Sequence, residues 1–204
     1  MRVNDITKVK PAKDFIVVQN IELDKNNELY FAKSSKPDPK NAELSFGKVL
    51  AIGPTALNLD SCPELKCEDT IVYNRYSGSH IATKQLNEIF KVMIGYNVMA
   101  RIDDINNLNE ETIYPSANRL LLAVKYVDQD ETGIFLDANE AKDPRLEDID
   151  YGTVIKIGPS CKLGYQIGDI VAYNPYSGEN IRPPGTADRP ALRVLIEEDV
   201  LLTI

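Results

Sequence analysis

The apolar residues of the chain gather in short runs of the length of β-strands. Phe15-Ile16-Val17-Val18 and residues 120–124 (LLLAV) are rich in aliphatic side chains, and both runs are too short for a helix. No longer stretch keeps an apolar period of 3.6 residues, and prolines interrupt the few candidates. The pattern therefore predicts an all-β chain.

An internal repeat organises these runs. The sequence FGKVLAIGP at 46–54 returns as YGTVIKIGP at 151–159, and DTIVYNRYSG at 69–78 returns as DIVAYNPYSG at 169–178. A third block, VMI at 92–94 with VMARI at 98–102, matches VLI at 194–196 with VLLTI at 200–204. Three blocks in the same order indicate that one module has been duplicated.

Each copy combines several short strands with turn signals, which predicts a small β-barrel or sandwich. Gly-Pro at 53–54 and 158–159 indicates a turn, and the two Tyr-Ser-Gly triplets indicate hairpin tips. We interpret Tyr76 and Tyr176 as packing residues of those hairpins. The expected division is a first module at 1–102, a polar, solvated linker at 103–114 and a second module at 115–204.

Each copy also holds one long polar segment, at 24–45 and at 128–150. Loops of this length are usually functional or disordered. Each is interrupted by one apolar patch, first Leu29-Tyr30-Phe31 and then Gly133-Ile134-Phe135-Leu136. An exposed apolar triplet needs something to receive it, so we expect a binding role for both. The alternative is that the triplets are strand residues of a core.

Composition narrows the classes of function. A net charge of -8 argues against nucleic acid as a partner, and no run approaches the length of a membrane span. Residues 1–14 contain no apolar run of the kind found in a signal peptide. Three cysteines do not suit a disulfide framework, which points to a reducing compartment.

Catalytic and metal-binding constellations are missing from the sequence. His80 is the single histidine, and Cys62 and Cys67 are poorly spaced for zinc, so we expect no metal site. His80 is expected to be solvated at a hairpin edge. There is no Gly-rich phosphate loop and no complete nucleophile–histidine arrangement, so we expect no enzyme activity.

Taken in order, the blocks resemble the ten-kilodalton co-chaperonin (GroES) family, and the resemblance covers nearly the whole chain twice. The tandem arrangement resembles the double co-chaperonins of chloroplasts. The resemblance implies two tandem GroES-like small β-barrels joined by a short polar linker. The matching positions are Pro11, Gly47, Val49, Ala51, Gly53, Asp69, Val72, Tyr76 and Gly78, then Pro115, Gly152, Val154, Gly158, Gly168, Asp169, Val171, Tyr176, Gly178, Asp199 and Val200.

The resemblance also implies a function. Such a protein caps a group I (GroEL-like) chaperonin ring and encloses a client protein for ATP-dependent folding, with ATP bound by the chaperonin and no cofactor on the cap. The contacts would be mobile-loop residues: Leu29, Tyr30, Phe31, Gly133, Ile134, Phe135 and Leu136. The cap would be a ring of modules. On a chaperonin ring with seven grooves, two-module chains would leave one groove empty or one module unused, or the cap would be a mixed ring with single-module co-chaperonins. The implied location is the cytoplasm of a bacterium or phage-infected host, or an organelle stroma or matrix.

Two departures from the family pattern lead to structural expectations. Glu68 stands where the family has Gly before Asp, so we expect that turn to be built differently. Residues 159–167 are too few for a full roof hairpin, so we expect a more open dome over the second module. The rival reading is a structural or adaptor tandem β-barrel without a chaperonin partner.

Overall fold

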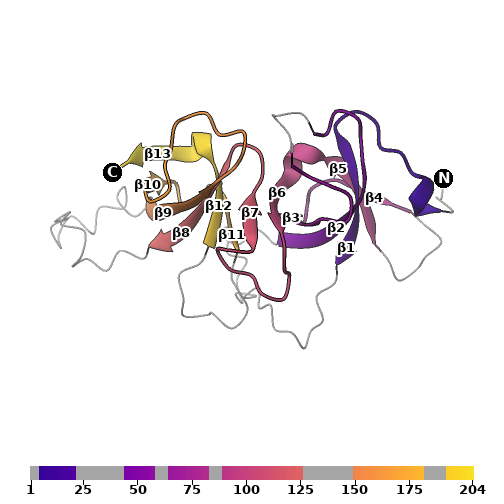
Figure 1. The fold of residues 1–204 in the computed structure, drawn as a ribbon, viewed down its shortest axis with the longest axis horizontal. Coiled ribbons are helices and arrows are strands. Elements are labelled where there is room, and N and C mark those ends of the chain that lie inside the picture. The colour runs from indigo at the N-terminus through magenta and orange to yellow at the C-terminus, as the bar shows by residue number, and fades with distance from the viewer. Residues whose placement is uncertain (1–4, 22–43, 58–63, 83–88, 126–148, 182–191) are drawn as a thin grey trace.

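A computed structural model describes residues 5–21, 44–57, 64–82, 89–125, 149–181 and 192–204. These residues form two antiparallel sheets with short 3₁₀ turns, and none of them lies in a helix of seven or more residues. The predicted all-β class is confirmed. Figure 1 shows the two sheets side by side along the long axis of the molecule.

The first sheet has seven strands in the order β4-β5-β1-β2-β3-β6-β7. Its strands are β1 (Phe15–Ile21), β2 (Leu44–Ile52), β3 (Thr70–Asn74), β4 (Ser79–Ile81), β5 (Phe90–Ile94), β6 (Val98–Ile102) and β7 (Ile113–Pro115). The second sheet has six strands in the order β11-β12-β8-β9-β10-β13. Its strands are β8 (Arg119–Lys125), β9 (Asp150–Ile157), β10 (Ile170–Tyr173), β11 (Glu179–Ile181), β12 (Leu192–Ile196) and β13 (Val200–Thr203).

The two sheets repeat each other strand by strand, as the sequence blocks do. The β1–β2 pairing shifts register after Val17, and the β8–β9 pairing shifts after Leu121, the equivalent residue. The exception is β7, which begins the second copy in sequence but pairs with β6 of the first sheet. The division at 1–102, 103–114 and 115–204 stays a prediction, and β7 is the contact that links its parts.

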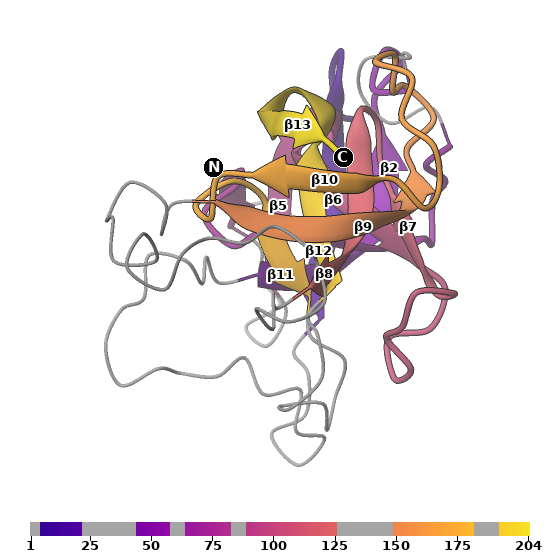
Figure 2. The ribbon, with the colours of Figure 1, turned by 90° about the vertical axis from the view of Figure 1, so that its left-hand side faces the viewer.

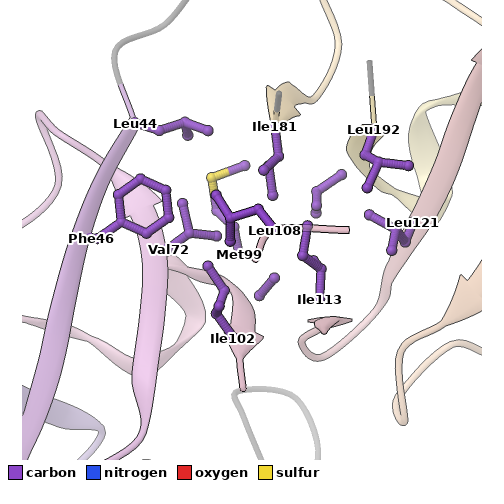
Figure 3. Packing of buried hydrophobic residues seen from close by; sticks show 12 residues of the cluster. Leu44, Phe46, Val72, Met99, Ile102, Leu108, Ile113, Leu121, Ile181 and Leu192 are labelled. Carbon is purple, nitrogen blue, oxygen red and sulfur yellow. The ribbon is translucent and has the colours of Figure 1, made fainter. Parts of the chain in front are cut away.

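Each module has an apolar cluster of its own, and a third cluster lies between them. The first module packs residues such as Ile16, Val49 and Met93, and the second packs Leu120, Val154 and Leu195. The third cluster takes side chains from both sheets, and Figure 3 shows them converging. Its members are Leu44, Phe46, Val72, Met99, Ala100, Ile102, Leu108, Ile113, Leu121, Ile181, Leu192 and Val194.

The join between the modules is only partly the solvated segment that was expected. Polar residues such as Asp104 and Glu110 are exposed, but Leu108 and Ile113 are buried in the shared cluster. Asn109 and Thr112 hydrogen-bond the intervening turn, which aims Leu108 inward. Burial of these two apolar side chains outweighs the polarity of their neighbours.

The turn before β3 contradicts the expectation drawn from Glu68. Glu68 N–H donates to Val49 O at 2.8 Å, and Gly168 N–H donates to Val154 O at the same distance. In both turns the following aspartate, Asp69 or Asp169, accepts a backbone N–H at 2.7 Å. The turns are therefore built alike, and Glu68 takes a left-handed φ of 76° where Gly168 has 101°.

No strand pair forms between Gly158 and Gly168, so this segment is not a roof hairpin. It is held instead by the carboxylate of Glu197, which accepts backbone hydrogen bonds from Lys162 and Leu163 at 2.8–3.0 Å. The openness of the dome itself stays a prediction.

Candidate functional site

Both predicted apolar triplets lie outside the described residues. These are Leu29, Tyr30 and Phe31 in segment 22–43, and Gly133, Ile134, Phe135 and Leu136 in segment 126–148. The structure gives the strands that hold those segments. The first connects β1 to β2 and the second connects β8 to β9, which are equivalent antiparallel pairs. The two segments therefore leave the modules from equivalent positions.

The base of the first segment rests on the cluster between the modules. Ile21, the last residue of β1, packs against that cluster, and Leu44, the first residue of β2, belongs to it. Ile181 and Leu192, which flank segment 182–191 of the second module, lie on the same cluster (Figure 3). Residues that flank segment 22–43 of the first module and segment 182–191 of the second therefore pack in one apolar cluster.

A buried cation holds the Tyr-Ser-Gly hairpin of each module. In the second module the guanidinium of Arg193 donates to Ser177 O at 2.8 Å and to Pro175 O at 2.5 Å, and it lies 4.9 Å from the Tyr173 ring centre. It also pairs with Asp150, at the base of the second segment, at 3.4 Å. In the first module Lys91 occupies the same place and donates to Arg75 O.

The tyrosines of these hairpins are exposed, which corrects the prediction that they are packing residues. The side chain of Tyr76 is 79% exposed and that of Tyr176 is 60% exposed. The hairpins do not need them for packing, because an asparagine closes each turn. Asn74 and Asn174 accept hydrogen bonds from the backbone N–H of Tyr76 and Tyr176 at 3.0 Å and 2.8 Å.

Polar contacts flank the apolar cluster between the modules. Arg119 donates to Tyr96 O at 2.7 Å, and Asn74 Nδ2 donates to the Glu179 carboxylate at 3.1 Å. Burial raises the pKa of Glu179, while the Asn74 hydrogen bond and Arg193 oppose that rise. A cavity of about 240 Å³ lies beside these contacts, with Asn74, Arg119 and Tyr176 among its walls.

Tyr114 makes a further contact across the same boundary. Two cations contact its ring, with Lys156 Nζ 3.8 Å and the Arg101 guanidinium 4.8 Å from the ring centre. Lys156 Nζ also donates to Ile113 O at 3.0 Å. Sequence reasoning missed Tyr114, Arg119 and Leu108. The available signal was a few bulky side chains in or beside an otherwise polar join.

The described residues offer neither a metal-binding cluster nor an activated nucleophile. Within the described residues there is no group of three or more His, Cys, Asp or Glu side chains that could hold a metal ion. His80 is exposed on β4, as predicted. Burial raises the pKa of the Cys161 thiol to about 11, and the nearby Glu197 carboxylate adds to that rise. A thiol with such a pKa is a poor nucleophile. Among the helices that the structure describes, none has the length and apolarity to cross a membrane.

Two repeated small β modules that share an apolar boundary define a tandem β-barrel protein. Comparison with known proteins narrows this class to a family. Residues 8–102 match the family described as the chaperonin 10 Kd subunit. The chain is 30% identical to the co-chaperonin GroES of Aquifex aeolicus (strain VF5) over 104 residues. These residues make up 50% of this chain and 82% of that protein. This chain is 31% identical over 77 residues to the co-chaperonin GroES of Staphylococcus carnosus (strain TM300), covering 36% of this chain and 78% of that protein. The chain belongs to the GroES-like co-chaperonin family.

Proposed function

We propose that this protein is a co-chaperonin that caps a group I chaperonin ring and encloses client proteins while the chaperonin uses ATP. The observation that carries the proposal is membership of the GroES-like family, supported by two relatives whose names give that role. The family is one of co-chaperones rather than enzymes, and the chain itself needs no cofactor for this role. We place it in the cytoplasm, where bacterial relatives of this kind act, or in an organelle stroma or matrix.

The proposed contacts with the chaperonin are the two apolar triplets. These are Leu29-Tyr30-Phe31, and Ile134-Phe135-Leu136 with Gly133 before them. Support comes from the equivalent strand pairs that flank the two segments, because equivalent anchoring presents both triplets from the same position in each module.

The energetics favour several contacts acting together. Burying three large apolar side chains gives about 5–8 kcal/mol gross, at about 1.5–3 kcal/mol each. Ordering five to ten loop residues costs about 1–2 kcal/mol for each residue. One loop therefore binds weakly, while several loops on one ring bind tightly through their high effective concentration. Such a cap can also be released as a unit when the receiving grooves change.

The test is refolding of a stringent client by a group I chaperonin and nucleotide, with this protein as the sole cap. We expect the wild type to support refolding and Phe135→Asp to abolish it, because a charge in an apolar groove is not solvated. Tyr30→Asp then reports whether the first segment contributes. Leu163→Asp is the matched control, since Leu163 is 59% exposed and lies outside both triplets.

The outcomes separate the two functional classes. If the wild type neither supports refolding nor binds chaperonins from several sources, a structural or adaptor role becomes the better explanation. If refolding survives both triplet substitutions, the cap binds through other residues. Supply of a single-module co-chaperonin in the same assay tests whether mixed rings form.

A further inference from the structure

The cavity of about 240 Å³ on the boundary between the modules has an apolar floor. Val194 and Ile196 stand two residues apart on β12, so they share one face of the second sheet, and both line the cavity. Met99 of the first module lines it as well. Figure 2 views the second module end-on, with β9 and β10 in front and β11 and β12 behind them, toward the first module. The floor therefore takes apolar side chains from both modules.

Two charged residues stand on the strands that flank this floor. Glu179 of β11 pairs with Val194, and Arg119 of β8 pairs with Ile196 on the other side of β12. Both charged residues line the cavity. The two positions are two strand spacings apart across the sheet and two residues apart along it, so their Cα atoms are about 12 Å apart. A carboxylate and a guanidinium thus border one apolar floor from opposite corners.

Each charged group is held in place by a contact from the first module. Asn74 Nδ2 donates to the Glu179 carboxylate at 3.1 Å, and the Arg119 guanidinium donates to Tyr96 O at 2.7 Å. Arg119 is 5% exposed. A ligand entering the cavity would meet groups that are already positioned, which lowers the entropic cost of binding.

The fold itself does not require these two charges. In the first module Ser79 and Phe15 occupy the positions of Glu179 and Arg119, since they pair with the equivalent residues of β5. Charges at a partly buried boundary are costly unless they are compensated, and the other copy of the module forms the same strands without them. The charged pair is therefore a candidate for a role beyond folding.

The size of the cavity limits the size of a ligand. An apolar cavity of about 150 Å³ holds one benzene molecule, so about 240 Å³ suits a ligand of about ten non-hydrogen atoms. A nucleotide or a folded protein is too large for such a space. A small molecule with two opposite charges and one apolar group matches both the volume and the walls.

We propose that the cavity binds a free apolar α-amino acid. The ligand carboxylate pairs with Arg119, because a planar guanidinium suits a carboxylate. The ligand ammonium pairs with the carboxylate of Glu179, and the aliphatic side chain lies on Val194 and Ile196. Each of the three groups of the ligand thus has a counterpart in the cavity.

The electrostatics of Glu179 favour a cationic group in the cavity. Burial raises the pKa of Glu179 because it disfavours the charged carboxylate, while the Asn74 hydrogen bond and Arg193 oppose that rise. A bound ammonium would add to this compensation. Ser77 and Asn97 also line the cavity, and their hydroxyl and amide groups can complete the hydrogen bonds of the ligand.

The experiment is isothermal titration calorimetry of the full chain with leucine and three analogues, with no chaperonin present. Leucine supplies all three groups, whereas N-acetyl-leucine lacks the ammonium, leucinamide lacks the carboxylate and glycine lacks the side chain. We expect leucine to bind, and each analogue to bind at least about tenfold more weakly. Because the ligand is changed rather than the protein, this comparison does not depend on the folding of a variant.

A protein variant locates the binding. Glu179→Gln keeps an oxygen that can accept the Asn74 hydrogen bond but removes the charge, so it should weaken leucine binding at least about tenfold. Glu110→Gln is the matched control, since Glu110 is an exposed carboxylate outside the cavity, and it should bind leucine as the wild type does. Circular dichroism verifies that each variant keeps its strands.

Three outcomes would overturn the proposal. These are a wild type that does not bind leucine, an analogue that binds as tightly as leucine, and a Glu179→Gln variant with unchanged affinity. The titration uses the free chain, so its failure would not count against the cap function, and failure of the refolding assay would not count against this site.

Discussion

Arg119 of the second module lies with its guanidinium 4.7 Å from the ring centre of Tyr96 in the first module, and it also donates to Tyr96 O at 2.7 Å. Arg119 is 5% exposed and Tyr96 is 37% exposed, so the charged partner is the shielded one. Hydrogen bonds from charged donors are among the stronger ones, and a buried partner left alone is destabilising. This contact fixes the start of β8 in the second module to the turn before β6 in the first.

Replacing Arg119 by Met should lower the free energy of unfolding by about 1.5–3 kcal/mol. Met keeps the length of the side chain but leaves Tyr96 O without this donor. Urea unfolding followed by circular dichroism measures the change. Arg119→Lys, which retains the charge but loses the planar group, should fall between Met and the wild type. An unchanged midpoint for the Met variant would show that the contact is not stabilising.

Replacing Leu108 by Ala should lower the free energy of unfolding by about 2–4 kcal/mol, the usual range for a buried leucine. Leu108 is 1% exposed and packs in the cluster shared by the two modules. Its loss should therefore also separate their unfolding, giving two transitions where the wild type has one. Calorimetry detects the separation. Leu57→Ala is the control, since Leu57 is 43% exposed and its loss should have little effect.

Replacing Glu68 by Gly should raise the free energy of unfolding by about 1 kcal/mol. The left-handed conformation of a non-glycine residue costs about 1–2 kcal/mol, and glycine removes that strain. The exposed ion pair with Lys48 that the substitution removes contributes little.

The reverse substitution tests the same explanation at the equivalent turn. Gly168→Ala should lower the free energy of unfolding by about 1 kcal/mol, since Gly168 has a φ of 101° and its Cβ would meet no atom within 4 Å. A loss therefore reports backbone strain rather than a steric clash. Thermal unfolding measures both changes in stability. If Glu68→Gly and Gly168→Ala shifted the free energy of unfolding in the same direction, backbone strain would not explain these turns.

Replacing Glu179 by Gln should stabilise the protein at neutral pH but not at low pH. The pKa of Glu179 is raised in the folded state, chiefly by burial, so the folded state disfavours its charged form. Wild-type stability from this group is lost as pH rises from the ordinary pKa, 4.5, through the raised one. The difference between variant and wild type should therefore vanish below the ordinary pKa and reach its full size above the raised one. Urea unfolding at several pH values measures it, and a difference independent of pH would rule out this titration.

Much of the fold could be predicted from local patterns. Short aliphatic runs and Gly-Pro turns are sufficient for strands, because strand formation depends on alternate burial along a few residues. The internal repeat supports these strand predictions, since each sequence block occurs twice in the same order. The turn at Glu68 was predicted wrongly. Asp69 and the Val49 carbonyl define that turn through hydrogen bonds, and these outweigh the preference of one residue for negative φ.

The candidate site was also predictable only in part. The apolar triplets are evident in sequence because they interrupt polar segments, and their role stays a prediction. The exposure of Tyr76 was not predictable, because the residue types and spacing of a hairpin do not say whether other elements cover an aromatic side chain there. Only the positions of Asn74 and Lys91 in the structure show that the hairpin is held without it.

The sequence by itself determined the all-β class, the duplication and the family, because these depend on the order and spacing of residues along the chain. The tertiary structure decided that the two modules share an apolar cluster and that β6 is covered while β13 is bare. Leu202 and Ala100 occupy equivalent positions in equivalent strands, yet their burial differs completely. Burial depends on which distant strand lies alongside, and chain connectivity supplies β7 to only one of them.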